Sequence, residues 1–309
     1  MTSSRLASID FGTNTARLLI AERRSEGIAP LLIERIIVRM GGGFSAENGL
    51  SAEAWARGMA CLRTFADIVA AHEVSRVRAV ATSAVRDAVN GTAFVEAVAR
   101  ETGLRLSVID GTEEGRLTFA GVTAGLARRE SELLVFDVGG GSTEYTYMRQ
   151  GAPLFIRSLP IGVVRLTEGK GEPAAMTEKI SRELISLRAD MESSNAVPAP
   201  GIQLVGTAGT ATTLAAISME MTDYDYRRVN NALLGRDQIE SIYQRLLPMS
   251  CAERLQVPGL EKGREDLIIA GMLITLETMK QFGCSQMTVS DYGLLEGLVV
   301  DGEEAGLMV

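Results

Sequence analysis

The chain has 309 residues, of which 46% are hydrophobic and 23% are charged, and its formal net charge is −8 at pH 7. This composition is typical of a globular protein and excludes a disordered chain, and the length corresponds to about two domains. The negative charge and an aromatic content of only 5% argue against nucleic acid as a partner, because electrostatic attraction and base stacking would both be weak.

The cysteines and the histidine limit the metal chemistry. Cys61, Cys251 and Cys284 are far apart in the sequence and form no C-x-x-C pair, which argues against a disulfide framework and a zinc site. The single histidine, His72, excludes mechanisms that need a histidine cluster. The N-terminus lacks the apolar core of a signal peptide, and the longest apolar run, residues 267–276, is too short to span a bilayer. We therefore expect a cytoplasmic protein with no membrane partner.

The first part of the chain alternates between strand-like and helix-like patterns. Residues 5–11, 16–22 and 30–39 predict three successive strands, joined by the GTNT turn and by a turn at 23–27. The pattern then predicts a helix at 51–71 with Ser51 as its N-cap, a strand at 76–82, a helix at 91–102 closed by Gly103, a strand at 105–110, and a helix from about Thr112 to Gly125.

The second part repeats the first. Residues 133–148 read as strand, glycine turn and strand, as residues 6–21 do, and Asp137 occupies the place of Asp10. The remaining patterns predict a strand at 153–159, helices at 177–192, 236–247 and 264–281, a strand, loop and helix at 202–214, and a last strand, loop and helix at 286–300. The repeat predicts two similar α/β domains, residues 1–127 and 128–309, with a cleft between them and a terminal helix able to pack back on the first domain.

Three loops combine glycine with hydroxyl side chains at strand ends: DFGTNT at 10–15, DVGGGST at 137–143 and VGTAGTAT at 205–212. Glycine lets backbone N–H groups approach an anion, and hydroxyl groups add further donors. The alternative is that each loop is only a tight turn, and none has the P-loop or dinucleotide-binding pattern. The candidates for phosphate binding are Thr13, Asn14, Gly139, Gly140, Gly141, Ser142, Gly206, Thr207, Gly209 and Thr210.

Acidic residues stand beside two of these loops. Asp10 and Asp137 end their strands, and Glu144 follows on the strand that leaves the second loop. Carboxylates next to a phosphate loop usually serve a divalent cation, so we expect these residues to be metal ligands. The alternative is that each aspartate caps its own turn.

A further pair of segments carries charge near strand ends. Arg86, in ATSAVRDAVN, follows a strand and could hold a phosphate with its guanidinium group. Glu113 and Glu114 begin a helix, where one of them could activate a water molecule. The alternative is that both glutamates only complement the helix dipole. Weaker candidates for phosphate contacts are Arg39, Arg165 and Arg264.

These motifs occur in order with LPIGVVRLTE at 159–168, GTAGTATTLAA at 206–216 and VSDYGLLEG at 289–297. Together they resemble the exopolyphosphatase/guanosine pentaphosphate phosphatase family, over essentially the whole chain. The resemblance implies two ribonuclease-H-like domains with mixed sheets flanked by helices, of the actin/hexokinase/heat-shock chaperone ATPase superfamily, and an active site in the interdomain cleft. It implies hydrolysis of the terminal phosphate of inorganic polyphosphate or guanosine pentaphosphate with Mg²⁺, or with Mn²⁺, and it is compatible with a homodimer.

The resemblance also implies roles for individual residues. Glu114 matches the general base of the family's E-E-A-R motif, and Arg86 matches a phosphate ligand. Asp137 and Glu144 match acidic residues that bind metal and water, and the glycine loops match phosphate cradles. Leu295 departs from the pattern, because it stands where the family has an arginine. From the resemblance we expect a short form of the family, without the C-terminal His–Asp domain of longer members.

Two other functions fit parts of the pattern. A sugar or carboxylate kinase of the same superfamily would share the fold and the phosphate loops, but it would need its base beside an acceptor hydroxyl rather than beside water. A non-catalytic regulator that binds a guanosine alarmone would bind nucleotide without releasing phosphate.

Overall fold

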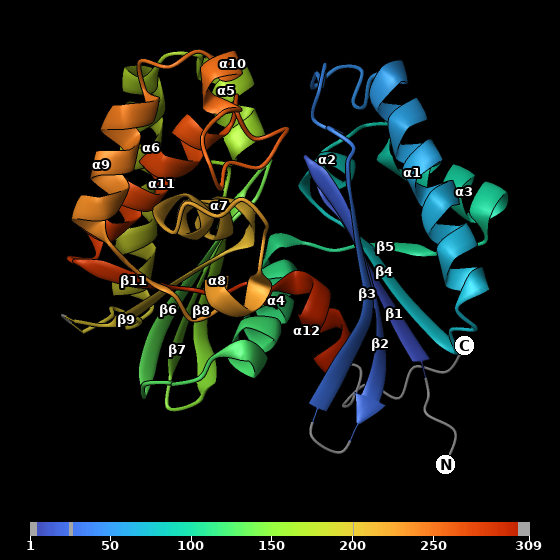
Figure 1. Ribbon diagram of the computed structural model, residues 1–309, viewed down its shortest axis with the longest axis horizontal. Coiled ribbons are helices and arrows are strands. Elements are labelled where there is room, and N and C mark those ends of the chain that lie inside the picture. The colour runs from blue at the N-terminus through green and yellow to red at the C-terminus, as the bar shows by residue number, and fades with distance from the viewer. Residues whose placement is uncertain (1–4, 25–26, 200, 302–309) are drawn as a thin grey trace. The chain divides into compact units, whose positions relative to one another are not determined.

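The computed structural model describes residues 5–24, 27–199 and 201–301 (Figure 1). Contacts divide the chain into two compact units: unit 1 takes the residues up to Gly121 and those from Leu294 on, and unit 2 is Val122–Gly293. Residues 1–4 of the N-terminal segment, residues 25–26 of the expected turn and residues 302–309 of the expected second domain lie outside the described part. Within that part, no helix has both the length and the apolar content needed to cross a membrane.

Unit 1 is built on a mixed five-stranded sheet in the order β3-β2-β1-β4-β5. Strands β2 and β3 run antiparallel in a meander from β1, whereas β4 runs parallel to β1 and β5 parallel to β4. The elements of this unit are β1 Arg5–Phe11, β2 Thr15–Arg24, β3 Gly27–Ile37, α1 Ala52–Ala71, β4 Arg76–Ala81, α2 Ser83–Arg86, α3 Gly91–Thr102, β5 Leu106–Val108 and α12 Leu294–Val300, with α4 Gly111–Gly125 continuing into unit 2.

Helices cover both faces of this sheet. Alternate residues of β1, Ala7, Ile9 and Phe11, are buried in the core that α1 and α3 share with the sheet. The residue between them, Ser8, faces the other way and donates to the carbonyl of Leu295 in α12, at 2.7 Å. Figure 1 shows α1 and α3 on one side of the sheet and α12 on the other. The period of two along β1 therefore reflects a strand that is buried on both faces.

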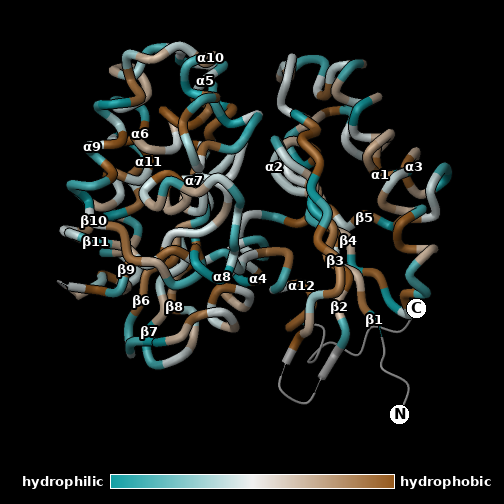
Figure 2. Tube along the Cα trace, viewed as in Figure 1, coloured by the Kyte–Doolittle hydropathy of each residue, from teal (hydrophilic) through white to brown (hydrophobic). Residues whose placement is uncertain are grey.

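Unit 2 has a six-stranded mixed sheet in the order β10-β11-β9-β6-β7-β8. Its core packs helices α5, α6, α7, α9 and α11 against one face of β6 and β7, and hydrophobic stretches follow the strands of each sheet (Figure 2). The elements are β6 Glu132–Val138, β7 Thr143–Arg149, β8 Ala152–Leu159, α5 Val163–Lys170, α6 Pro173–Ser193, β9 Gln203–Thr207, α7 Ala208–Ser218, α8 Tyr226–Val229, β10 Leu233–Gly235, α9 Arg236–Leu246, α10 Cys251–Arg254, α11 Ile268–Gln281 and β11 Gln286–Val289.

The two sheets repeat one topology. Strands β6, β7, β8, β9 and β11 of unit 2 take the places of β1 to β5 of unit 1, and β10 is added at the edge. The α/β class, the mixed sheets and the flanking helices predicted from the sequence are confirmed. The contacts divide the chain after Gly121, inside α4 (Gly111–Gly125), and they group the residues from Leu294 on with unit 1.

Some elements are absent from the sequence prediction. The short elements α2, α5, α8, β10 and α10 have too few residues to establish a hydrophobic period. The helix expected from residue 264 begins instead at Ile268, after a turn in which the N–H of Ile268 donates to the carbonyl of Arg264 at 2.9 Å.

Gly297 lets α12 approach α4 closely. A Cβ atom at this position would lie 1.9 Å from the carbonyl oxygen of Leu117 and 3.2 Å from the amide nitrogen of Gly121. We therefore expect Gly297→Ala to lower the free energy of unfolding by about 1–3 kcal/mol, as for other overpacked cores, measured by urea denaturation. The control is Gly169→Ala in α5, where a Cβ meets nothing within 4 Å and better helix propensity should raise stability by up to about 1 kcal/mol. Equal stability of Gly297→Ala and the unsubstituted protein would contradict this packing.

Candidate active site

The first loop of unit 1 joins β1 to β2 and holds the start of α2. The N–H of Gly12 donates to the carbonyl of Thr15 at 3.1 Å, and a Cβ at Gly12 would lie 2.9 Å from that oxygen. The buried Thr13 accepts a hydrogen bond at Oγ1 from the N–H of Ala84, at 3.2 Å. The GTNT loop and the ATSAVR segment, far apart in sequence, are therefore in direct contact.

Two buried polar atoms flank this contact without a partner in the described part of the chain. They are Oδ1 of Asn14 and Oγ of Ser83, which belong to residues 6% and 2% exposed. The other end of the Asn14 amide donates to Oγ1 of Thr15 at 3.3 Å. An unsatisfied buried polar group costs about 1–3 kcal/mol, so both atoms are suited to a bound ligand or water. The sequence prediction included Asn14 but missed Ser83, although a hydroxyl directly after a strand was a usable signal.

Arg86 and Glu114 form the central ion pair of unit 1. Nη1 of Arg86 donates to Oε2 of Glu114 and to the carbonyl of Ile109, both at 3.1 Å. The Glu114 residue is 8% exposed. Nε of Arg86 lies 3.6 Å from Oδ1 of Asp87. Among described residues, Nη2 of Arg86 has no hydrogen-bond partner, so the guanidinium is oriented through Nη1 and Nε and can bind an anion with Nη2.

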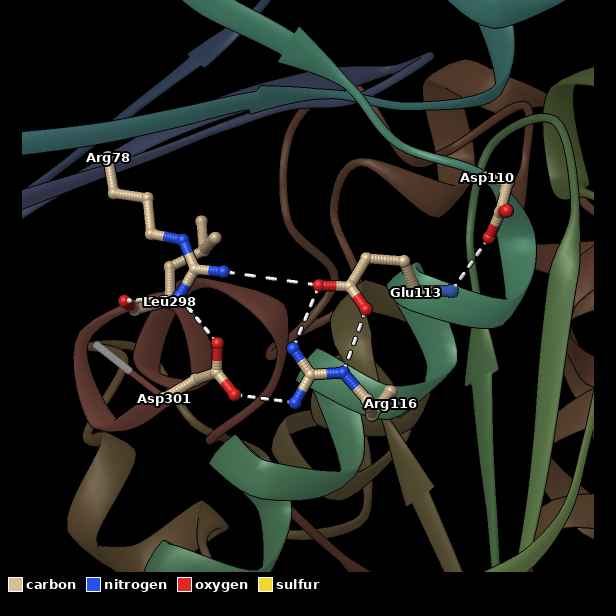
Figure 3. Close-up of polar contacts among 6 residues, drawn as sticks. All are labelled: Arg78, Asp110, Glu113, Arg116, Leu298 and Asp301. Carbon is tan, nitrogen blue, oxygen red and sulfur yellow. Dashed lines mark hydrogen bonds and ion pairs between the residues drawn. The ribbon is translucent and has the colours of Figure 1, made fainter. Parts of the chain in front are cut away.

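Glu113 is held differently from Glu114. Arg116 donates from Nε and Nη2 to the two carboxylate oxygens of Glu113, at 2.7 and 2.8 Å, and its Nη1 binds Asp301 (Figure 3). The N–H of Glu113 donates to Oδ1 of Asp110 at 2.8 Å, which caps the start of α4. Of the two adjacent glutamates, Glu114 is therefore the one directed to Arg86, and Glu113 belongs to an ion-pair network.

Asp10, the first predicted metal ligand, lies in an ion pair. Arg17 is opposite Asp10 on β2, and its Nη2 and Nε donate to Oδ2 of Asp10 at 3.0 and 3.3 Å. One carboxylate oxygen is thus already occupied by an arginine. The role of Asp10 as a metal ligand stays a prediction.

The glycine loop of unit 2, between β6 and β7, is shaped by α5. The N–H groups of Val163 and Val164 donate to the carbonyls of Gly139 and Gly140, at 3.0 and 2.9 Å. A Cβ at Gly162 would lie 2.3 Å from the carbonyl carbon of Gly140, so only glycine allows this approach. The carbonyl groups of the loop are therefore directed toward the start of α5.

Three of the four N–H groups of this loop have no acceptor among the described residues. Gly139 donates to the carbonyl of Ser142 at 3.0 Å. For Gly140, Gly141 and Ser142, no acceptor of the N–H group is found in the described ranges. Successive N–H groups of this kind form an anion-binding concavity. This arrangement fits the predicted phosphate cradle, and α5, which the sequence analysis missed, supports it.

Asp137 and Glu144 lie beside this loop on neighbouring strands. They are directly opposite each other in the β6–β7 register and therefore share a face of the sheet. Both residues are buried, and Oγ of Ser158 donates to Oε1 of Glu144 at 2.7 Å. Two opposed carboxylates repel each other unless a cation or proton intervenes. Such a pair fits Mg²⁺, which proteins commonly hold with one or two carboxylates together with substrate phosphates.

No larger metal-binding group is present among the residues with described positions, where no three His, Cys, Asp or Glu side chains gather. Any metal at Asp137 and Glu144 would therefore complete its coordination with water and substrate oxygen atoms.

Most candidate residues of the third loop, at the start of α7, pack against neighbouring elements of unit 2. A Cβ at Gly206 would lie 2.9 Å from the Phe136 ring, and Thr210 lies against Gly271, so both have packing roles. Oγ1 of Thr207 donates to the carbonyl of Tyr292 at 2.9 Å.

Gly209 is covered by an arginine. A Cβ there would lie 1.9 Å from Nη1 of Arg264, whose Nε donates to Glu261 at 2.8 Å. The structure thus places Arg264 at the start of α7, where its charge favours an anion.

The remaining candidates differ in their surroundings. Arg165 donates from Nε to the carbonyl of Gly141 at 2.7 Å, and Arg39 donates its backbone N–H to the carbonyl of Asn14 at 2.9 Å.

Leu295 is buried in α12 against Leu19 and Ala21 of β2. An apolar residue at position 295 is therefore explained by packing.

Comparison with known proteins identifies the group to which this chain is related. Residues 19–305 match the sequence profile of the Ppx/GppA phosphatase family. The chain belongs to the Ppx/GppA phosphatase family. It is 34% identical to exopolyphosphatase 2 of Mycobacterium tuberculosis, over 97% of this chain and 99% of the relative.

Two solved structures share the fold over nearly the whole chain. An exopolyphosphatase from Cytophaga hutchinsonii superposes with a TM-score of 0.88 at 27% identity, and covers 97% of this chain and 98% of its own. A Ppx/GppA family member from Aquifex aeolicus gives 0.80 at 33% identity, and covers 98% and 99%. The resemblance proposed from the sequence motifs is confirmed.

Arg86→Ala tests the anion-binding role of Nη2, which has no hydrogen-bond partner in the described part of the chain. Because a hydrogen bond to a charged group contributes about 1.5–3 kcal/mol, we expect kcat/KM for phosphate release to fall about 10–100-fold, with a clear rise in KM. The control is Arg63→Ala, which removes an exposed ion pair with Glu101 in the same unit. Unchanged kcat and KM in Arg86→Ala would show that Arg86 does not contact the substrate.

Proposed function

We propose that this chain is a Mg²⁺-dependent phosphohydrolase that releases the terminal phosphate of inorganic polyphosphate or guanosine pentaphosphate. The observation that carries the proposal is the pair of Arg86 and Glu114, a buried carboxylate beside a guanidinium whose Nη2 has no hydrogen-bond partner among the described residues. Membership of a phosphatase family and the likeness to an exopolyphosphatase support the choice of reaction.

Unit 1 supplies the groups for water and for one phosphate. Glu114 accepts a proton from the attacking water, and Nη2 of Arg86 binds a phosphate oxygen. Neither Oδ1 of Asn14 nor Oγ of Ser83 has a hydrogen-bond partner among the described residues. Oδ1 of Asn14 can accept a hydrogen bond from a water molecule, and the hydroxyl of Ser83 can donate one to a phosphate oxygen. Phosphoryl transfer requires positioning and charge stabilisation more than covalent chemistry, and this set of groups provides both.

Unit 2 supplies a cradle for phosphate. The N–H groups of Gly140, Gly141 and Ser142 bind phosphate oxygens, and Arg264 adds positive charge at the start of α7. The carboxylates of Asp137 and Glu144 would hold Mg²⁺, which supplies charge neutralisation for the phosphate oxygens. With that charge compensated, the acidic pair no longer opposes a polyanionic substrate.

The experiment is a parallel assay of phosphate release from polyphosphate and from guanosine pentaphosphate, each with Mg²⁺ and with chelator. The proposal expects release from at least one substrate with Mg²⁺ and none with chelator. Nucleotide binding without phosphate release would contradict hydrolysis and favour an alarmone-binding regulator. Transfer of phosphate from ATP to an added sugar or carboxylate acceptor, without release from either substrate, would favour a kinase.

A further inference from the structure

Four charged side chains from three segments of unit 1 form a closed network, which we call the brace: Arg78, Glu113, Arg116 and Asp301 (Figure 3). Arg78 lies on β4, Glu113 and Arg116 on α4, and Asp301 directly after α12. Nη1 of Arg78 donates to Asp301 at 2.7 Å, and its Nη2 lies 3.9 Å from Glu113. With the two bonds from Arg116 to Glu113 and the bond from Arg116 to Asp301, each member contacts two others.

The brace is partly shielded from solvent. The Asp301 side chain is 11% exposed. Hydrogen bonds from Arg116 and Arg78 lower the pKa of the Asp301 carboxyl group, although burial of that group acts in the opposite direction. Two arginines balance two carboxylates, so the network has no net charge. Such a network holds its members in one arrangement because each guanidinium has a fixed fork of donors.

The brace and the Arg86–Glu114 pair are joined by two short stretches of chain. Along β4 and into α2, the chain runs from Arg78 to Arg86. Along α4, Glu113 is followed directly by Glu114, and successive side chains of a helix leave it about 100° apart. The spacing between β4 and the first turn of α4, which the brace fixes, therefore also sets the spacing between Arg86 and Glu114.

Helix α12, which precedes Asp301, packs against both β4 and α4. Nη1 of Arg78 also lies 3.4 Å from the carbonyl of Leu298, and Gly297 packs directly on Leu117 of α4. Leu117, Leu294 and Leu298 share a small buried cluster with Val80 of β4. Asp301 is therefore held against both β4 and α4 by packing as well as by charge.

We propose that the brace is a positioning device for the general base, in which Arg116 and Asp301 hold the first turn of α4 so that Glu114 keeps its place beside Arg86. This inference rests on the proposed role of Glu114 in hydrolysis. Arg116 and Asp301 touch neither substrate nor water in this account and act only through Glu113 and the backbone of α4. A displacement of about 1 Å in a catalytic group can cost about 10²-fold in rate.

The test measures kcat and KM for phosphate release in Asp301→Asn, Arg116→Ala and Arg116→Lys. We expect kcat to fall about 10–100-fold in Asp301→Asn and Arg116→Ala, with KM changed less than about two-fold, because positioning of the base and not phosphate binding is disturbed. Arg116→Lys keeps the charge but loses the two-pronged contact, so we expect it to restore only part of kcat. If Arg116→Ala does not fold, Asp301→Asn and Arg116→Lys carry the same test.

A double-mutant cycle separates positioning from general destabilisation. In the Glu114→Gln background, Asp301→Asn should cause no further loss of kcat, because no base remains to be positioned. The matched control is Val98→Ala, a cavity in the α3 side of the same unit, which should lower the melting temperature without lowering kcat well below that temperature. Arg63→Ala controls for loss of an exposed ion pair.

The outcomes distinguish failure of the positioning proposal from failure of the proposed function. If the unsubstituted protein releases phosphate and Glu114→Gln does not, but the brace variants keep full kcat, the positioning proposal is overturned and the proposed function stands. An additive loss in the double mutant also overturns it. If the unsubstituted protein releases no phosphate from any substrate, or Glu114→Gln is fully active, the proposed function itself fails.

Discussion

Replacing Glu114 by glutamine should lower kcat for phosphate release about 10²–10⁴-fold, the usual contribution of a general base. The substitution keeps the size of the side chain and its contact with Arg86, but removes the carboxylate that we propose as the proton acceptor. KM should stay the same or fall, because one negative charge near the phosphate is lost. The measurement is steady-state phosphate release with Mg²⁺, under conditions in which the melting temperatures of both proteins are known.

Two further substitutions make this result specific. Glu113→Gln should lower kcat by a smaller factor, because Glu113 is bound to Arg116 and acts on the base only through position. Glu101→Gln, at an exposed ion pair of the same unit, should leave kcat unchanged. Near-normal kcat in Glu114→Gln, with a large loss in Glu113→Gln, would move the base to the neighbouring residue and reverse our assignment.

Asp137→Asn should abolish most of the activity, and so should removal of divalent metal. An amide is a poorer ligand for a hard cation than a carboxylate, and lost charge stabilisation of several kcal/mol corresponds to at least about 10²-fold in rate. The measurement is phosphate release titrated with Mg²⁺ after treatment with chelator. Direct binding of Mn²⁺, followed by electron paramagnetic resonance, provides a readout that does not depend on activity.

The control for this prediction is Asp237→Asn, an exposed carboxylate in the first turn of α9. It should leave both Mn²⁺ binding and activity unchanged. Full activity after complete chelation would show that the opposed pair of Asp137 and Glu144 serves another purpose, such as sharing a proton.

Local features of the fold were predictable because they depend on neighbours in sequence. Ser51 was predicted as an N-cap, and its side chain accepts a hydrogen bond from the N–H of Ala54 at 3.2 Å. Gly103 was predicted to end a helix, and it has the left-handed φ of 74° that glycine adopts without strain. The repeat of strand, glycine turn and strand at Asp10 and Asp137 correctly predicted the repeated sheet topology.

Contacts between distant segments were not predictable in the same way. The bond between Arg116 and Asp301 joins residues 185 positions apart, and no periodicity links them. Residue spacing alone therefore left the choice between Glu113 and Glu114 open. The family resemblance favoured Glu114, and the ion-pair partners in the structure distinguish the two glutamates. The place of Arg264 above Gly209 and the support of the glycine loop by α5 likewise depend on packing between segments.

The central claim is that water attacks the terminal phosphate, and hydrolysis in H₂¹⁸O tests it most directly. We predict that phosphate released from polyphosphate or guanosine pentaphosphate in the presence of Mg²⁺ carries a single ¹⁸O atom from the solvent, measured by mass spectrometry. The Glu114→Gln variant should form this labelled phosphate at a rate lower by the same factor as its kcat. Release of unlabelled phosphate, or appearance of the phosphate only on an added acceptor, would contradict the account.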